Sequence, residues 1–441
     1  MAQNAPVIDR LFGLEKFGIK LGLENVTRLC EAFGHPERRF TTIHVAGTNG
    51  KGSVTAMVHA ALLAAGIRAA RYTSPHLSDV TERFVIGHDP VSSDALEQVA
   101  TDVLDTADRL RDSGVMSATP TFFEATTVVA FELFRRAKVD VAVIEVGLGG
   151  RFDATNVIQP VAGAITTIGF DHQQHLGHTL EAIAFEKAGI VKPGMTVVTG
   201  RLPESAIAVV RKAAAGRGAR LIEATHALVS SDMRDGHAHV SFRTAAGAYG
   251  PLPLALAGEH QVDNALVAVQ VLEAAADAGV PVGPEAIEQG LETTRWPARL
   301  ERVRLADGRS LLFDAAHNEE GALALATHIR RWHVTPPTLV IGVMKDKDVD
   351  AILRILLPVA GRVVATAAQT PRALPAAELA ARMHAVADAL RIGYQAPLSY
   401  EDDPLAAVAA ALAHGGEVCV AGSIFLVGEV RERLRQRAIL R

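Results

Sequence analysis

A glycine-rich segment that holds a lysine between two glycines carries the clearest chemistry in the chain. It reads GTNGKGS over residues 47–53, after a short apolar run and before a helical pattern. In that position, glycines let backbone N–H groups approach an anion, and the helix N-terminus adds positive potential. Lys51 can neutralise phosphate charge, and Ser53 or Thr48 can reach a phosphate or its magnesium ion. The segment predicts a nucleotide phosphate site.

The spacing of this loop differs from the usual G-x-x-x-x-G-K-[ST] pattern. Two residues separate Gly47 from Gly50, and Gly52 separates Lys51 from Ser53. A plain glycine turn between a strand and a helix is the alternative interpretation. A lysine between two glycines at a helix start disfavours that alternative. The loop by itself indicates nucleotide binding and leaves the reaction open.

Further polar segments are expected at the ends of buried strands, where ligands gather in open α/β sheets. The segments are YTSPHL at 72–77, EVGLGGRFDATN at 145–156, FDH at 170–172, EKAGI at 186–190 and FDAAHN at 313–318. All but EKAGI, which we place at a helix end, are predicted at strand ends. Ser74, Glu145 and His172 offer a hydroxyl, a carboxylate and an imidazole, a mixed set that Mg²⁺ tolerates while keeping several waters. A helix-capping role for Glu145 and a structural role for His172 are the alternatives.

The elements that would position these segments alternate between short apolar runs and amphipathic stretches. Strands are expected at 42–45, 139–146, 162–168, 196–198, 311–313, 339–343, 362–366 and 418–421. Helices are expected at 52–65, 122–136, 180–187, 319–332 and 425–437. This order implies βαβ units and parallel sheets. We predict an α/β fold with two domains, the first a P-loop-type, mostly parallel sheet with helices on both faces, the second smaller and Rossmann-like.

The boundary between the domains is expected at the dipeptide Trp296-Pro297, because proline disfavours helix in the residue before it. We place a nucleotide-binding domain at residues 1–298 and a second domain at residues 299–441.

Bulk composition limits the function classes. The chain has 441 residues, 49% hydrophobic and 21% charged, with a formal net charge of -5, which excludes gross disorder and disfavours a nucleic-acid binder. Its two cysteines, Cys30 and Cys419, form no disulfide or thiolate-metal pattern. We find no signal-peptide pattern and no membrane-length apolar run, and expect a cytoplasmic protein with no membrane partner.

Taken together, the strings GTNGKGS, YTSPHL, EVGLGGRFDATN, EKAGI, RWPARLE and DAAHN resemble the folylpolyglutamate synthase/dihydrofolate synthase family of the Mur ligase superfamily. The resemblance runs from about residue 18 to the C-terminal helix. It implies an ATP-dependent, ADP-forming ligase that adds L-glutamate to a pterin-linked carboxylate through an acyl phosphate. The substrate would be dihydropteroate, a reduced folate, or both.

The resemblance also implies roles for individual residues. ATP contacts would come from Thr48, Asn49, Gly50, Lys51, Gly52, Ser53, Asn264, Arg299 and Asp314. Ser74, Glu145, His172 and a carbamylated Lys187 would hold magnesium, with two ions expected. Lys51, Lys187 and His317 would act in catalysis. From the chain alone, Lys187 reads as a surface lysine ending a helix.

Substrate contacts implied by the resemblance lie in three segments and at one serine. They are Thr121, Phe122, Phe123, Glu124, Phe152, Asp153, Ala154 and Ser423, and the segment 19–21. Lys20 stands where some bifunctional members carry an aspartate, which puts the dihydropteroate activity in question. A core aromatic for Phe123 and a helix cap for Ser423 are the alternatives. Ala298 and Ala315 replace usual glycines, a small change unless the backbone needs a positive φ.

Three other functions are alternatives for this chain. Another Mur-type ligase, such as a peptidoglycan precursor synthetase, would usually carry an extra N-terminal domain, for which the residues before 47 leave too little chain. Folylpolyglutamate synthase activity alone is the second. A nucleotide-binding switch is the third, and it would need neither the 313–318 segment nor Ser74, Glu145 and His172 beside the loop. By family analogy we expect a monomer.

Overall fold

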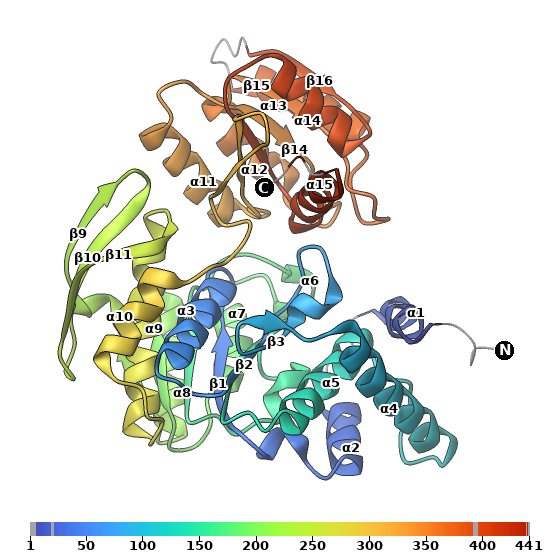
Figure 1. Ribbon diagram of the computed structural model, residues 1–441, viewed down its shortest axis with the longest axis vertical. Helices are drawn as coiled ribbons and strands as arrows, with labels where there is room; N and C mark the ends of the chain where they lie inside the picture. The colour runs from blue at the N-terminus through green and yellow to red at the C-terminus, as the bar shows by residue number, and fades with distance from the viewer. Residues whose placement is uncertain (1–5, 19–21, 391–395, 438, 440–441) are drawn as a thin grey trace. The chain divides into compact units, whose positions relative to one another are not determined.

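The computed structural model describes residues 6–18, 22–390, 396–437 and 439 (Figure 1). The chain forms two compact units. Unit 1 comprises Met1–Ser231, Val240–Pro253 and Asp263–Thr294, and unit 2 comprises Asp232–His239, Leu254–Val262 and Arg295–Arg441. The predicted contact segment 19–21, with Lys20, lies outside the described residues.

Unit 1 is built on an eight-stranded sheet in the order β4-β3-β2-β5-β1-β6-β7-β8 (Figure 1). The strands are β1 Thr41–Ala46, β2 Ala69–Tyr72, β3 Phe84–Ile86, β4 Asp89–Pro90, β5 Val141–Glu145, β6 Ala162–Ile165, β7 Thr196–Thr199 and β8 Arg220–Glu223. Strands β2, β5, β1, β6, β7 and β8 pair in parallel, and β3 and β4 are added antiparallel at one edge. The predicted mostly parallel sheet is confirmed.

Helices surround this sheet on both faces, because its strands bury alternate side chains against two apolar cores. One core joins β2 and β5 to α2, α4 and α5, and the other joins β6 and β7 to α7 and α8. The helices are α1 Val7–Phe12, α2 Glu24–Ala32, α3 Lys51–Ala64, α4 Ser93–Asp112, α5 Phe122–Arg136, α6 Gln173–Leu176, α7 Leu180–Lys187, α8 Glu204–Gly216, α9 His260–Asp277 and α10 Pro284–Thr293. Since α3 follows β1 directly, the glycine-rich loop opens at the carboxyl end of a central strand.

Unit 2 is built on a six-stranded sheet in the order β12-β13-β17-β14-β15-β16. Its strands are β12 Glu301–Arg304, β13 Ser310–Phe313, β14 Thr338–Ile341, β15 Arg362–Ala365, β16 Leu398–Tyr400 and β17 Val418–Ala421, and only the β12–β13 pair is antiparallel. The helices are α11 Glu319–Trp332, α12 Val349–Leu356, α13 Ala376–Ala389, α14 Pro404–Ala413 and α15 Ile424–Gln436. In the part of the chain that the structure describes, no helix has the length and hydropathy needed to cross a bilayer.

A three-stranded sheet between residues 228 and 257 was not predicted from the sequence. Its strands are β9 Leu228–Arg234, β10 His237–Arg243 and β11 Ala248–Ala257, and residues of all three strands are divided between the two units.

Two local features differ from the sequence analysis. Strand β6 ends at Ile165, earlier than the expected 168, so His172 lies in the connection to α6 and not at a strand end. Ala298 has a φ of 60°, so the backbone there does need the left-handed conformation that glycine adopts without cost. Ala315 is not among the described non-glycine residues with positive φ.

Candidate active site

The glycine-rich loop is held in place by the connection that follows β6. The N–H of Thr48 donates to the carbonyl of Thr167 at 2.8 Å, and the N–H of Asn49 donates to Thr167 Oγ1 at 3.0 Å. Gly50 caps α3 with a φ of 82°. A Cβ at Gly47 would overlap the side chain of Thr166, and one at Gly50 would overlap Asn264. A side chain at either position would therefore clash, and Asn264 packs directly against the loop at Gly50.

Lys51 folds back over its own loop. Its Nζ donates to the carbonyls of Gly47 and Thr48, each at 3.1 Å. The ammonium group therefore lies over the loop that the sequence assigns to phosphate. Gly52 and Ser53, which follow in the first turn of α3, are both buried, so their surroundings are fixed by packing.

Lys187 reaches the same loop from the last residue of α7. It is 5% exposed, and its Nζ donates to the carbonyl of Gly47 at 2.7 Å. Burial lowers the pKa of Lys187 to about 7, helped by the nearby charge of Lys51 and opposed by Asp171 and Asp153. The interpretation of Lys187 as a surface lysine is wrong. Two lysines from distant segments converge on one carbonyl of the phosphate loop.

The carboxyl ends of β2 and β5 bring two of the predicted metal ligands together. The N–H of Ser74 donates to Glu145 Oε2 at 3.3 Å, and Glu145 is 4% exposed. His172 caps α6 with a φ of 50°, and its backbone N–H donates to Asp171 Oδ1 at 2.9 Å. Serine and carboxylate oxygens are hard donors that fit Mg²⁺. Among the described residues, no cluster of three or more His, Cys, Asp or Glu side chains is arranged as a metal site.

The first predicted substrate segment has a structural role of its own. Thr121 and Glu124 form a capping box at the start of α5, with Thr121 N–H to Glu124 Oε2 at 2.7 Å and Glu124 N–H to Thr121 Oγ1 at 3.2 Å. Phe122 is buried and stacks on Phe12 with 5.4 Å between ring centroids. Phe123 is half-buried, packs against the core and lies 6.0 Å from the Tyr72 ring.

The second predicted substrate segment is a loop closed by Asp153. The Asp153 carboxylate accepts from the N–H of Leu148 at 2.8 Å and from the N–H of Thr155 at 3.0 Å, and burial raises its pKa. The Thr155 hydroxyl also donates to Asp153 and lies 2.9 Å from His44 Nε2. His44 is fully buried on β1. These contacts tie the loop to the central strand of the sheet.

The neighbours of Asp153 differ in exposure. Ala154 is buried, whereas the Phe152 ring is 38% exposed and lies 4.2 Å from the Arg151 guanidinium. Of the two, only Phe152 keeps a large surface that a ligand could contact.

In unit 2, Asp314 is buried at the end of β13. It accepts from the N–H groups of Leu300 and Ala316, each at 2.9 Å. Burial raises the pKa of Asp314, and the charge of Arg299 opposes that rise. His317 donates through Nδ1 to the carbonyl of Ala315 at 2.8 Å, so this ring nitrogen carries a proton. Unit 2 therefore brings Arg299, Asp314 and His317 together.

Ser423 is 1% exposed at the start of α15, and its Oγ accepts from the N–H of Phe425 at 3.2 Å. The structure thus shows the helix cap that the sequence analysis gave as the alternative for this residue.

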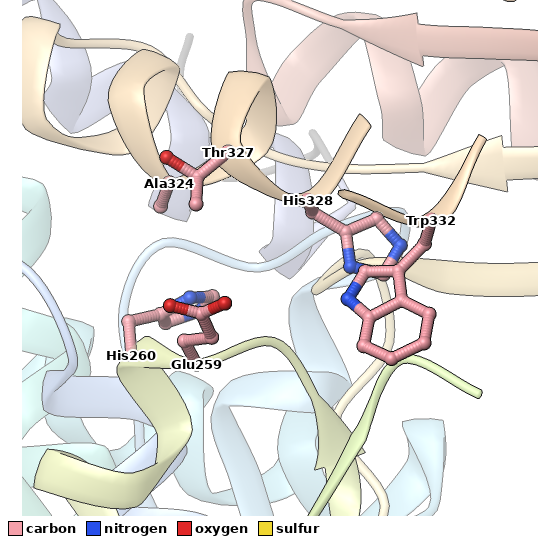
Figure 2. Close-up of a pocket in the computed structure, with 6 residues that line it drawn as sticks. All are labelled: Glu259, His260, Ala324, Thr327, His328 and Trp332. Carbon is pink, nitrogen blue, oxygen red and sulfur yellow. The ribbon is translucent and has the colours of Figure 1, made fainter. Parts of the chain in front are cut away.

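A separate pocket of about 200 Å³ lies in unit 2, and Figure 2 shows the side chains that line it. They are Glu259, His260, Ala324, Thr327, His328 and Trp332. None belongs to the predicted site residues. Burial lowers the pKa values of His260 and His328 to about 4, so both imidazoles are neutral at pH 7.

Sequence reasoning missed Asp171, His44 and Arg83. Asp171 lies beside His172 in the FDH segment and acts electrostatically on Lys187. His44 precedes the loop by three residues on β1. An imidazole within an apolar strand could have been recognised from the sequence as a candidate for a polar contact. Arg83 is buried beside the residues of the YTSPHL segment, and its distance from any recognised motif gave no signal.

The comparisons with known proteins first define a class. The family described as "Mur ligase middle domain" matches residues 45–272, the part that holds the glycine-rich loop, Glu145 and Lys187. The family described as "Dihydrofolate synthetase, C-terminal domain" matches residues 302–436. The fold and the loop are thus those of a Mur-type ligase.

Individual relatives define the family. A folylpolyglutamate synthase of Lacticaseibacillus casei is 34% identical, with 93% of each chain covered. A dihydrofolate synthase/folylpolyglutamate synthase of Bacillus subtilis is 32% identical and covers 96% of this chain and 97% of its own. The solved structure of Mycobacterium tuberculosis folylpolyglutamate synthase complexed with ADP has a TM-score of 0.88 at 32% identity, covering 97% of this chain and 98% of that one. The chain belongs to the folylpolyglutamate synthase/dihydrofolate synthase family, as its motifs indicated.

The depressed pKa of Lys187 generates a stability prediction. Because the folded pKa of about 7 lies below the unfolded value of 10.5, the unfolded chain binds more protons between these pH values, and stability rises with pH across that window. Removing the amine with Lys187→Met removes this dependence. We expect the unfolding free energy of wild type to gain about 2 kcal/mol relative to Lys187→Met between pH 7 and 9.

Denaturant unfolding in CO₂-free, metal-free buffer measures this difference. Lys212→Met is the matched control, because Lys212 is exposed on α8 elsewhere in unit 1. A wild-type advantage over Lys187→Met that is flat from pH 7 to 9 would contradict the buried, neutral lysine.

Proposed function

We propose that this chain is an ATP-dependent ligase that joins L-glutamate to a pterin-linked carboxylate and releases ADP and phosphate. The observation that carries the proposal is the convergence of Lys51 and Lys187 on the Gly47 carbonyl within a glycine-rich loop. The pterin-linked acid is dihydropteroate, a reduced folate, or both. The names of the B. subtilis and L. casei relatives support this substrate class.

The chemistry requires activation of the acid. A carboxylate oxygen attacks the γ-phosphorus of ATP, and ADP leaves. The amine of L-glutamate then attacks the acyl carbon, and phosphate leaves through a tetrahedral intermediate. Catalysis of such steps is mainly positioning and charge stabilisation. Lys51 supplies positive charge at the loop, and the flanking glycines give backbone N–H groups access to the phosphates.

Magnesium is the second part of the proposal. Ser74, Glu145, His172 and Lys187 are the residues that would hold it, with two ions expected. Magnesium held there would supply positive charge that stabilises the developing phosphate charge. In support, the Ser74 backbone N–H donates to Glu145 Oε2 at 3.3 Å, which brings the two residues together, and Asp171 adds a carboxylate beside His172.

Carbamylation of Lys187 is the third part. The neutral amine nitrogen would attack the carbon of CO₂, and one proton would leave as the carbamate anion forms. The pKa of about 7 supports this step, because much of the amine is neutral at pH 7. A carbamate would also replace repulsion between two cations, Lys51 and Lys187, by attraction, and would turn Lys187 into a metal ligand.

The remaining assignments are proposals of the same kind. Asn264, Arg299 and Asp314 would contact the nucleotide, and His317 would face the reacting centre. The pterin-linked acid would contact Thr121, Phe122, Phe123, Glu124, Phe152, Asp153, Ala154 and Ser423. We propose a functional division at residues 298/299, a monomer, and a cytoplasmic location. Folylpolyglutamate synthase activity alone is the alternative function, since Lys20 replaces an aspartate of some bifunctional members.

A phosphate-release assay with ATP and L-glutamate tests the function, with dihydropteroate and a reduced folate offered separately. We expect release that requires both L-glutamate and a pterin-linked acid, and loss of at least about a hundredfold in Lys51→Ala, because one charge-stabilising group is removed. Thermal unfolding controls for damage to the loop. If neither acid supports phosphate release, the proposal is rejected. If only the reduced folate supports release, the alternative function is selected.

Substituting the proposed metal carboxylate tests magnesium. Glu145→Gln keeps the side-chain shape and removes the charge, so we expect a higher magnesium requirement and a slower rate together. The test is phosphate release titrated with MgCl₂, and Glu132→Gln, a buried glutamate paired with Arg135 on α5, is the matched control. An unchanged magnesium titration in Glu145→Gln refutes the metal role.

Labelled bicarbonate tests the carbamate. Wild type in ¹³C-bicarbonate should show a carbamate carbon resonance that Lys187→Arg lacks, since arginine stays protonated and cannot react. Lys192→Arg serves as the control that should retain the signal. Identical spectra for wild type and Lys187→Arg would exclude a carbamate at this residue.

A further inference from the structure

Arg83 is a buried cation that forms no ion pair within the described part of the chain. It ends the short 3-10 helix Val80–Arg83, and only 7% of its surface is exposed. A guanidinium remains charged in a protein and is rarely buried unless a carboxylate accompanies it. No salt bridge joins Arg83 to any residue that the structure describes.

The immediate partners of Arg83 are neutral. Its Nε–H donates to His76 Nδ1 at 2.9 Å, so that nitrogen carries no proton. An imidazole whose Nδ1 accepts a hydrogen bond is not a cation, so His76 does not add a second positive charge. The guanidinium carbon lies 5.0 Å from the centre of the Phe122 ring, and Tyr72 is close enough to Arg83 to influence its pKa.

These partners orient the guanidinium without neutralising it. Burial lowers the pKa of Arg83, and Glu15 and Glu145 oppose this only through space. Phe122 is fixed from another side by Phe12, with rings 14° from parallel. A charge that is desolvated, held in one orientation and unpaired is costly to the fold, and an anionic ligand would remove that cost.

The position of Arg83 connects it with the proposed substrate site. Tyr72 and His76 belong to the YTSPHL segment, and Phe122 belongs to the proposed pterin segment. Glu145, which acts on Arg83 electrostatically, is the proposed metal carboxylate. Three separate motif segments therefore surround one unpaired cation.

We propose that Arg83 binds a carboxylate of the small-molecule substrates and so selects acids over their neutral analogues. The inference rests on the proposed function. A fork of N–H donors that meets a carboxylate forms strong, charge-assisted hydrogen bonds. The carboxylate belongs either to the pterin-linked acid or to L-glutamate, and the two sources are separated below.

Arg83→Met tests the proposal, because methionine keeps much of the length and removes the charge. The dissociation constants of dihydropteroate and its methyl ester are measured by calorimetry, and the KM for L-glutamate by phosphate release. If the pterin-linked acid is the ligand, its affinity falls at least tenfold while ester affinity is unchanged. If L-glutamate is the ligand, its KM rises at least tenfold while both pterin affinities are unchanged.

Stability separates this role from a structural one. If Arg83 serves ligand binding, its unpaired charge lowers the stability of the ligand-free protein. We therefore expect the melting temperature of ligand-free Arg83→Met to be no lower than that of wild type. Arg83→Lys keeps the charge without the fork and should retain part of the acid-over-ester preference. Arg28→Met, at a half-exposed arginine of α2, is the matched control and should change neither binding constant.

Equal loss of acid and ester, or no loss of either with an unchanged KM for L-glutamate, overturns the role of Arg83. Should Arg83→Met not fold, Arg83→Lys decides, since an unchanged acid-over-ester ratio and unchanged KM there also overturn it. Failure of the wild-type chain to bind any pterin-linked acid rejects the proposed function itself, which is a distinct result.

Discussion

The carbonyl of Gly47 is the point on which the candidate site of unit 1 depends. It accepts from Lys51 at 3.1 Å and from Lys187 at 2.7 Å, so one backbone oxygen joins the phosphate loop to the end of α7. The arrangement is possible because Gly47 has a φ of 150° and no Cβ to meet Thr166. Burial lowers the pKa of Lys187 to about 7, and the nearby charge of Lys51 adds to this shift, so a large share of the Lys187 amine is neutral near pH 7.

The loop 147–156 completes the frame around Lys187. The Arg151 N–H donates to the Glu186 carbonyl at 2.8 Å, and Asn156 Nδ2 donates to Gly189 O at 3.2 Å, so the loop grips the turn in which α7 ends. Asp153 closes the loop, and Thr155 links Asp153 to His44 on β1. The 145–156 and 186–190 segments are thereby fixed to each other and to β1.

The sequence was most informative where one signal dominated. Apolar runs separated by amphipathic stretches predicted the parallel sheets, and helices α5, α7 and α11 begin and end where their patterns indicated. The 228–257 sheet was missed because only β10 alternates cleanly between buried and exposed positions, while β9 is almost wholly exposed. The convergence of Lys51 and Lys187 was not visible either, since the two lysines are 136 positions apart in the sequence and only packing brings them together. That Arg83 is buried without an ion pair among the described residues could likewise not be predicted, because the folded structure alone shows which side chains surround it.

Ala298 has a consequence for backbone equilibria. An L-residue other than glycine at a φ of 60° carries about 1 kcal/mol of excess energy or somewhat more, and Leu300 nearby repeats the condition at 49°. This energy shifts the conformational equilibrium of residue 298. The equilibrium constant for a change to negative φ is about fivefold larger with alanine at this position than with glycine. The methyl group of Ala298 therefore helps to set the conformational equilibrium of the backbone from residue 298 to 300, independently of any ligand.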